Sequence, residues 1–427
     1  MTSLADKDHR YLWHPFTQMK DWMAEEPVII ESGQGAILRD VDGREYIDAN
    51  SSIWTNLHGH QHPRITQAIK DQLDRIAHSS FLGLSNGPAI ELAEKLVAIA
   101  PRGLTRVFYS DDGSTAMEVA IKMALQYWQH RKQPQRTKFV AFADAYHGDT
   151  LGAVSVGGIN LFHSAFRPLL FDVVRVNEID QVAQLMRGHR DTVAAVVIEP
   201  LVQGAAGMRL WKRGLLGELR RLCTEHGALL IADEVMTGFG RTGTMFACEQ
   251  EGVTPDLMAV AKGLTGGYLP LAATLTTGKI FDAFLGDYGE FKTFFHGHSY
   301  TGNQLGCAAA LASLQVFEDE QTLKALQPKC AQLRAGLEAM RQLPHVGDVR
   351  HMGMIGAIEL FQDVPAKKPF PVADRMGIKV CMEMRRRGVL TRPIGNTVVL
   401  MPPYCIRDEQ LDRVLSVLAE SVQSVSY

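Results

Sequence analysis

The chain has 427 residues, of which 46% are hydrophobic and 21% are charged, and its formal net charge is −3 at pH 7. These values are typical of a globular protein with more than one domain, and they argue against a surface for nucleic acid or for an anionic membrane. No apolar run approaches the roughly 18 residues that a membrane-spanning helix needs. The six cysteines are widely spaced and the first residues are polar, so we expect reduced thiols and a cytoplasmic location.

The N-terminal part of the chain is expected to form short elements. Residues 36–48 have the pattern of two strands around an Asp-Gly turn. Two helices are predicted next, over residues 63–77 and 88–100, because apolar residues recur at helical spacing and a proline opens each segment.

Strands and helices alternate from about residue 104. Strands are predicted at residues 106–110, 138–142, 193–199, 228–233 and 256–261, with helices at 116–131 and 215–226. This alternation predicts an α/β fold whose central sheet is mostly parallel and covered on both faces, with ligands at the carboxyl ends of the strands. A helix over residues 304–319 is predicted to lead into a smaller α+β domain.

The expected division of the chain therefore has three parts. Residues 1–60 form an N-terminal arm that belongs to the small domain, residues 61–324 the large domain, and residues 325–427 the C-terminal small domain.

One lysine and one aspartate stand at the ends of two buried runs. Lys262 follows the apolar run 256–261, and Asp233 ends the run that begins at residue 228. This pair suits pyridoxal 5'-phosphate (PLP), because a lysine forms a Schiff base with its aldehyde and a carboxylate keeps its ring nitrogen protonated. Each residue alone is equally compatible with a surface lysine or a helix-capping aspartate.

Other polar motifs stand beside predicted strands and helices. Gly113 and Ser114 lie between a strand and a helix, where backbone amides and a hydroxyl bind phosphate, although such residues are also typical of an ordinary N-cap. Tyr146 follows another strand and offers an aromatic face to a flat ring, or is a plain loop residue. Ser299 precedes the helix at 304–319 and is a second candidate for a phosphate contact.

Histidines at positions 58, 60, 62, 296 and 298 raise the possibility of a metal site. They occur on glycine-containing segments without thiolate or carboxylate partners at ligand spacing, so we predict no metal. Arg392, before a strand of the small domain, could bind a carboxylate with two hydrogen bonds, or be a surface arginine.

In combination these motifs resemble the class III (ω-type) aminotransferases of the fold-type I PLP family, over essentially the whole chain. The resemblance rests on Asp233-Glu-Val-Met-Thr-Gly-Phe-Gly-Arg-Thr-Gly243, on Lys262 in Ala-Lys-Gly-Leu-Thr-Gly-Gly, on Gly113-Ser114 and on Tyr146-His-Gly-Asp149. It implies that Lys262 is the Schiff-base lysine and proton carrier, with Asp233 at the ring nitrogen. It also implies that Gly113 and Ser114 bind the phosphate and Tyr146 the ring.

The same resemblance implies a homodimer with active sites at the interface. Ser299, with its neighbour His298, would then reach the cofactor phosphate from the other subunit.

Within the class, the sequence resembles the diaminononanoate synthases of biotin biosynthesis, which transaminate 8-amino-7-oxononanoate. The supporting stretches are residues 12–19, 51–54, 58–60, 122–128, 246–249, 391–393 and 401–404. This implies that Arg392 binds the substrate carboxylate. The further substrate contacts that it implies are Phe16, Ile53, Trp54, Tyr146, Lys262 and Gly297.

The amino donor is predicted from differences within that group. Members that use S-adenosylmethionine typically carry tyrosine, tryptophan and tyrosine where this chain has Phe16, Ile53 and Val399, so L-lysine is favoured as the donor. One alternative is another ω-aminotransferase acting on a diamine, ornithine or a 4-aminobutyrate-like acid. The other is a non-catalytic PLP-binding regulatory dimer, which would be expected to have lost Lys262 or Asp233.

Overall fold

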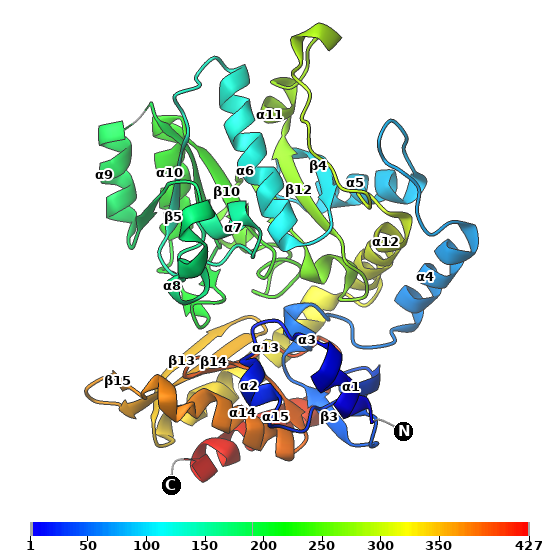
Figure 1. Cartoon of the computed structure of the whole chain (residues 1–427), viewed down its shortest axis with the longest axis vertical. Coiled ribbons are helices and arrows are strands. Elements are labelled where there is room, and N and C mark those ends of the chain that lie inside the picture. The colour runs from blue at the N-terminus through cyan, green and yellow to red at the C-terminus, as the bar shows by residue number, and fades with distance from the viewer. Residues whose placement is uncertain (1–2, 190, 426–427) are drawn as a thin grey trace.

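The computed structural model describes residues 3–189 and 191–425, which form a large unit above a smaller one (Figure 1). The order of the strands across the central sheet is β4 (Leu104–Ser110), β12 (Ala272–Thr277), β11 (Leu257–Val260), β10 (Leu229–Asp233), β7 (Val193–Ile198), β5 (Lys138–Phe142) and β6 (Val173–Val176). Strand β12 is antiparallel to both of its neighbours, and the other pairings are parallel. The predicted α/β fold with a mostly parallel sheet is confirmed.

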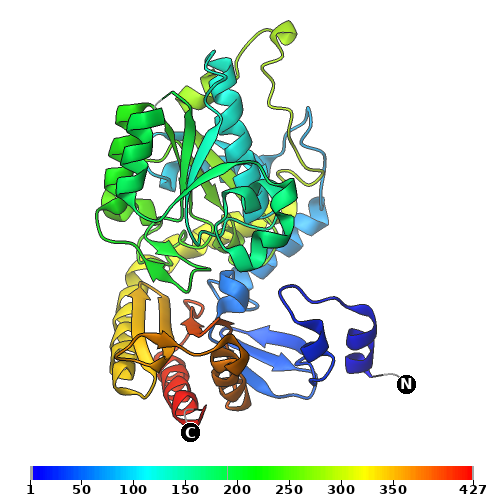
Figure 2. The same ribbon diagram turned by 60° about the vertical axis from the view of Figure 1, so that its left-hand side comes forward.

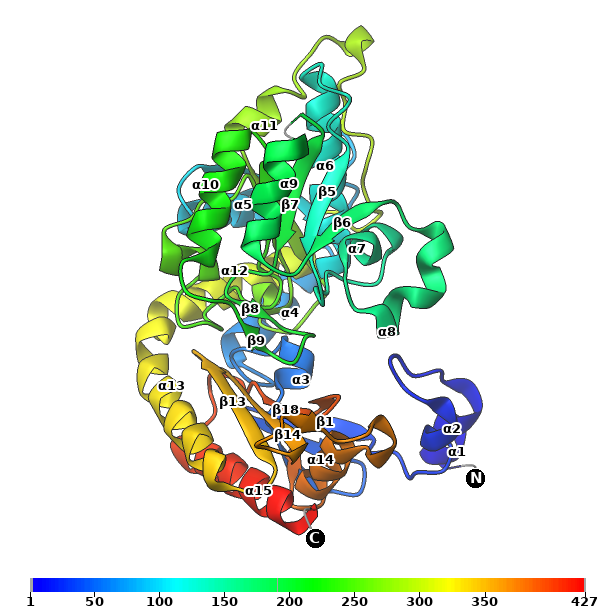
Figure 3. The same ribbon diagram turned by 90° about the vertical axis from the view of Figure 1, so that its left-hand side faces the viewer.

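Helices cover both faces of this sheet because its central strands are apolar on both sides. Along β7, Val197 packs in the cluster that contains α6 (Gly113–His130), and Val196 packs in the cluster on the opposite face. That second cluster includes side chains of α9 (Ile179–His189) and α10 (Leu215–His226). Figure 3 shows α9 and α10 on one side of the strands and α6 on the other.

The smaller unit combines both ends of the chain. One of its sheets is built from β13 (Val346–Met352), β14 (Ile355–Asp363), β18 (Thr397–Leu400) and β17 (Pro393–Ile394), with β15 (Lys368–Pro369) beside β14. The other contains β1 (Ile30–Gln34), β2 (Ile37–Asp40), β3 (Glu45–Asp48) and β16 (Val389–Leu390). Its helices are α13 (Thr322–Ala339), α14 (Met376–Arg386) and α15 (Asp408–Val425).

The parallel pairing of β3 with β16 joins the N-terminal sheet to the C-terminal part of the chain. We therefore propose that the first 60 residues and the residues after 324 form one domain, with the boundary inside the first turn of α13. The strands β2 and β3 form the antiparallel pair around the Asp-Gly turn that the sequence predicts.

Further helices complete the two units. They are α1 (Leu4–Tyr11), α2 (Met19–Trp22), α3 (Ser51–Trp54), α4 (Pro63–Arg75), α5 (Gly87–Ile99), α7 (Leu151–Val156), α8 (Asn160–His163), α11 (Gly278–Asp282) and α12 (Gln304–Asp319). A short pair, β8 (Val202–Gln203) and β9 (Arg209–Leu210), follows β7. In the part of the chain that the structure describes, no helix has the length and apolarity needed to cross a membrane. The six cysteines are free thiols.

Candidate active site

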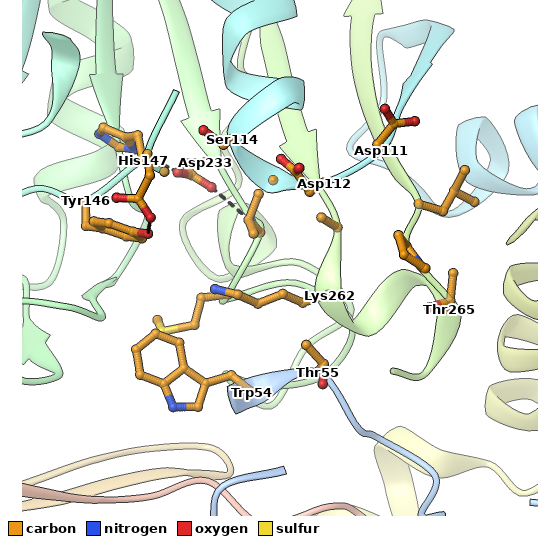
Figure 4. Close-up of a pocket in the computed structure, with 18 of the residues that line it drawn as sticks. Trp54, Thr55, Asp111, Asp112, Ser114, Tyr146, His147, Asp233, Lys262 and Thr265 are labelled. Atoms are coloured by element: carbon orange, nitrogen blue, oxygen red, sulfur yellow. Dashed lines mark hydrogen bonds and ion pairs between the residues drawn. The ribbon is translucent and has the colours of Figure 1, made fainter. Parts of the chain in front are cut away.

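Lys262 lies at the carboxyl end of β11, inside a cavity of about 760 Å³ (Figure 4). Its Nζ is 4.9 Å from the centroid of the Trp54 ring, which lies along the lysine side chain. Burial lowers the pKa of the Lys262 amine, and the carboxylates of Asp233 and Glu199 offset only part of this effect. The Lys262 amine is therefore uncharged more often than the amine of a surface lysine, so that its lone pair is available to react.

Asp233 ends β10, which is the parallel neighbour of β11, so the sheet brings its carboxylate to the same cavity. Its Oδ2 is 2.7 Å from Nδ1 of His147, and its Oδ1 accepts a hydrogen bond from the Val235 amide at 3.0 Å. Burial lowers the pKa of His147, but Asp233 more than compensates, so the pKa of this imidazole lies above its ordinary value. This shift favours the protonated form of His147, in which the two buried side chains pair as ions at 2.7 Å.

Glu199 follows β7 and adds another carboxyl group to the cavity. It is 6% exposed and accepts hydrogen bonds from the amides of Tyr146, at 3.1 Å, and Gly204, at 2.8 Å. Burial raises the pKa of Glu199 to about 7, although the neighbouring His147 opposes the shift.

The first turn of α6 borders the same cavity through Gly113 and Ser114. The first amides of a helix have no partner within the helix and are available to an anion. A side chain at Gly113 would crowd this place, because a Cβ there would lie 2.5 Å from Cγ1 of Val235. The Ser114 hydroxyl accepts a hydrogen bond from the Thr150 amide at 2.9 Å and is 2.8 Å from the Thr150 hydroxyl.

Tyr146 lies at the edge of the cavity and donates a hydrogen bond from its hydroxyl to Asp149 at 2.7 Å. Burial and this carboxylate raise the pKa of the Tyr146 phenol, which keeps it protonated. The Phe16 ring, from the N-terminal arm, meets the Tyr146 ring edge-on at 6.5 Å between centroids.

A second cavity, of about 960 Å³, adjoins the first and contains Phe16, Ile53 and Arg392. The structure thus divides the predicted substrate contacts between two cavities. Trp54, Tyr146 and Lys262 line the first cavity. Phe16, Ile53 and Arg392 line the second. Among residues 3–189 and 191–425, none pairs with the exposed Arg392 guanidinium, which is free for a carboxylate. Val399 lines neither cavity and is buried in a cluster that Trp54 packs against.

The segment with Gly297, His298 and Ser299 meets the site only through its histidine. Nδ1 of His298 is 2.7 Å from Oδ2 of Asp111, which lines the first cavity. Gly297 and Ser299 are exposed and line neither cavity of the single chain. The assignment of Ser299 to the site of a second subunit remains a prediction, as does that of Gly297 to the substrate.

The other histidines of the predicted loops have protein partners. His58 contacts the Ser313 hydroxyl at 3.0 Å, His60 the Asp48 carboxylate at 3.2 Å, and His62 the Glu320 carboxylate at 3.2 Å. Within the described residues, no group of three or more His, Cys, Asp or Glu side chains is arranged to hold a metal ion.

Three further residues of the site were not predicted: His147, Glu199 and Thr150, which contact Asp233, Tyr146 and Ser114 respectively. For two of them the sequence contains an indication. His147 directly follows Tyr146 in its motif, and Glu199 directly follows a buried strand, where parallel sheets place their ligands.

The model of the family "Aminotransferase class-III" matches residues 19–422 of the chain. A relative from Nitratidesulfovibrio vulgaris, named adenosylmethionine-8-amino-7-oxononanoate aminotransferase, is 53% identical over 99% of this chain and 82% of its own length. A protein of the same name from Geobacter sulfurreducens is 50% identical, over 99% of this chain and 98% of its own.

Solved structures with similar folds have related names. The adenosylmethionine-8-amino-7-oxononanoate aminotransferase of Methanocaldococcus jannaschii has a TM-score of 0.97 and 45% identity, covering 99% of this chain and 98% of its own. The omega transaminase of Pseudomonas jessenii, solved in complex with PMP, has a TM-score of 0.95 and 28% identity, with coverage of 99% and 98%.

Proposed function

Because this chain belongs to the class III aminotransferases, we propose that it transfers an amino group to the ketone of 8-amino-7-oxononanoate, giving the 7,8-diaminononanoate of biotin biosynthesis. The observation that carries the proposal is the buried amine of Lys262, which lies beside the Asp233–His147 ion pair in a chain 53% identical to a relative named for this reaction.

The residues of the first cavity fit pyridoxal 5'-phosphate. Lys262 offers an amine of lowered pKa, Asp233 offers a carboxylate on the neighbouring strand, and Gly113 keeps the start of α6 open to a phosphate. When bound there, the cofactor supplies an aldehyde carbon for the amino group and a ring that accepts electrons.

Lys262 is the group that moves the proton. Burial lowers the pKa of its amine, so uncharged Nζ would be available to take a proton from the carbon that carries the amino group and to release it later in the cycle. Asp233 would hold the proton of the ring nitrogen when the cofactor is bound, and His147 keeps that carboxylate in place. The Trp54 ring covers the amine and excludes water from one side.

Donor and acceptor use the same cavity in turn, as ping-pong kinetics require. Arg392 would bind the carboxylate of the acceptor with two hydrogen bonds. The aliphatic chain of the acceptor would then extend from the second cavity to the first. Mixing the holoenzyme with a donor and 8-amino-7-oxononanoate, and detecting 7,8-diaminononanoate by mass spectrometry, tests the proposal. If the enzyme turns over ornithine, a diamine or 4-aminobutyrate but does not accept 8-amino-7-oxononanoate, the alternative ω-aminotransferase is favoured.

We propose L-lysine as the amino donor, on the basis of the apolar Phe16 and Ile53 in the second cavity. The names of the relatives carry S-adenosylmethionine, which is the alternative donor. The double variant Phe16→Tyr/Ile53→Trp tests the proposal, because both side chains are partly exposed and can change without disturbing the core. We expect it to raise the rate with S-adenosylmethionine relative to lysine; an unchanged ratio would remove these residues from donor choice.

We also propose a homodimer. The support is a set of exposed large apolar side chains, Leu82 (92% exposed), Leu84 (63%), Phe295 (72%) and Tyr300 (61%). Phe295 belongs to the segment between α11 and α12, which runs along the outside of the large unit (Figure 2). Apolar exposure of this extent marks an interaction surface.

A further inference from the structure

The short helix α3 (Ser51–Trp54) is left-handed. Its four residues have φ angles of 47°, 48°, 68° and 67°, and none of them is glycine. The Trp54 amide donates to the Asn50 carbonyl at 2.8 Å and the Thr55 amide to the Ser51 carbonyl at 2.9 Å, so a full turn is closed. L-residues disfavour this conformation, and β-branched Ile53 does so most strongly, so the surroundings must hold the turn in place.

The Asp48 carboxylate provides much of that hold. Its Oδ1 accepts a hydrogen bond from the Ser52 amide at 3.0 Å, and its Oδ2 accepts one from the Ser52 hydroxyl at 2.8 Å. Nε2 of His60 is 3.2 Å from the same Oδ2. We call Asp48, Ser52 and His60 the bracket. Independently of it, the Ser51 hydroxyl donates to the Met401 carbonyl at 2.6 Å.

The turn lies between the two cavities of the site. Trp54 lines the first cavity and covers Lys262, whereas Ser52 and Ile53 line the second cavity with Arg392. Consecutive residues of one turn therefore face the place of amino transfer and the place of carboxylate binding.

The bracket also connects the turn to the strand that leads to Arg392. Asp48 is the last residue of β3 and is paired with Leu390 of β16, and the Ala49 amide donates to the Leu390 carbonyl at 2.9 Å. Arg392 follows two residues later. Asp48 thus links two parts of the site: its carboxylate holds the turn that carries Trp54, and its backbone belongs to the strand pair that leads to Arg392.

We propose that Asp48, Ser52 and His60 are positioning residues that fix the spacing between Lys262 and Arg392 and thereby select the chain length of the acceptor. This inference rests on the proposed function, since it takes Arg392 as the group that binds the acceptor carboxylate. The ligand class that it selects is a linear keto acid whose ketone and carboxylate are separated by a fixed number of methylene groups.

The test compares kcat/KM for 8-amino-7-oxononanoate with that for its homologues with one methylene group fewer and one more between ketone and carboxylate. For the wild-type holoenzyme, kcat/KM is expected to be about tenfold or more higher for 8-amino-7-oxononanoate than for either homologue, because a misplaced methylene group or carboxylate weakens binding of the transition state. In Ser52→Ala and Asp48→Asn this preference is expected to fall by about threefold or more, chiefly through KM for the preferred acid.

Two further variants separate positioning from stability. Ser52→Gly removes the hydroxyl bond at an exposed position but tolerates the positive φ, so the turn can form without strain. It is expected to lose chain-length preference as Ser52→Ala does, with its cofactor absorbance unchanged. Asp42→Asn changes an exposed aspartate of the preceding turn and is expected to keep the wild-type preference.

Two results would overturn the inference, and they are distinguishable. Ser52 variants that are active and keep the wild-type chain-length preference would show that the bracket only stabilises the fold. A wild-type enzyme that accepts none of the three keto acids would remove the proposed function itself, and the inference with it.

Discussion

The charges in the first cavity are set by burial and by pairing. Lys262, which has no hydrogen-bonded partner of its own in the described part of the chain, has a lowered pKa, whereas His147, paired with Asp233 at 2.7 Å, has a raised one. The surroundings thus favour the neutral form of the Lys262 amine and the protonated form of the His147 imidazole.

Replacing Lys262 tests its proposed role as the group that carries the proton. Lys262→Ala removes the only amine that lines the first cavity among the described residues, so kcat is expected to fall by about a thousandfold or more. Steady-state assays with the keto acid measure the effect, and Lys279→Ala, at an exposed lysine, is the matched control. Retention of most of the activity by Lys262→Ala would contradict its role.

Glu199 gives a pH dependence of stability. Its pKa is about 7 in the folded protein and 4.5 as an unperturbed carboxyl group. A carboxyl group whose pKa rises on folding stabilises the folded state below about pH 4.5, and this contribution is lost as the pH rises through about 7. Between these values, the free energy of unfolding of the wild type should fall by on the order of 3 kcal/mol relative to Glu199→Gln.

Urea unfolding of both proteins across this pH range measures the difference. Glu178→Gln, at an exposed glutamate, should follow the wild-type curve. Parallel curves for the wild type and Glu199→Gln would mean that the pKa of Glu199 does not change on folding, which contradicts the prediction.

Among the elements, α6 begins at the first cavity, and its start is the proposed phosphate site. Gly113→Ala places a Cβ at 2.5 Å from Cγ1 of Val235, so one of the two must move into the space for the phosphate. The Kd for pyridoxal 5'-phosphate is expected to rise by about tenfold, which corresponds to a modest steric cost. Absorbance titration of the apoprotein measures it.

Gly278→Ala is the control for this helix start. Gly278 also opens a helix, α11, but the nearest atom to its added Cβ is 3.5 Å away. Equal Kd values for the two variants would contradict the role of Gly113 in the phosphate site.

The elements that could be predicted from the sequence are those with a clear run or spacing of apolar residues. The buried strands β7 and β10 are continuous apolar runs, and the Lys262 and Asp233 positions follow from strand ends at one edge of a parallel sheet. Strand β6, with only four residues, and strand β12, with its threonines, were not predicted because their apolar signal is weak.

The turn at Ser51–Trp54 could not have been predicted from local sequence. Ser-Ser-Ile-Trp contains no glycine, and its conformation depends on Asp48 and Met401, of which the latter is 350 residues away from Ser51. Tertiary contacts decide such a segment against its local preference.

At the scale of the whole molecule, residues of both units line the two cavities. The large sheet places Lys262 and Asp233, and the N-terminal part of the smaller unit supplies Trp54 (Figures 1 and 4). The C-terminal part of the smaller unit supplies Arg392. The proposed function therefore predicts that substrate contacts both units, and the proposed dimer would bring Ser299 of one subunit to the site of the other.

A half-reaction titration tests the central claim most directly. The PLP-loaded protein is mixed separately with L-lysine and with S-adenosylmethionine, and the visible absorbance of the bound cofactor is followed. We expect lysine to remove this absorbance and 8-amino-7-oxononanoate to restore it, because one cavity serves both half-reactions. Loss of the band with S-adenosylmethionine alone would identify that compound as the donor in place of lysine, and the proposed transamination of 8-amino-7-oxononanoate would stand. If neither donor changes the band, or if the keto acid does not restore it, the proposed transamination is contradicted.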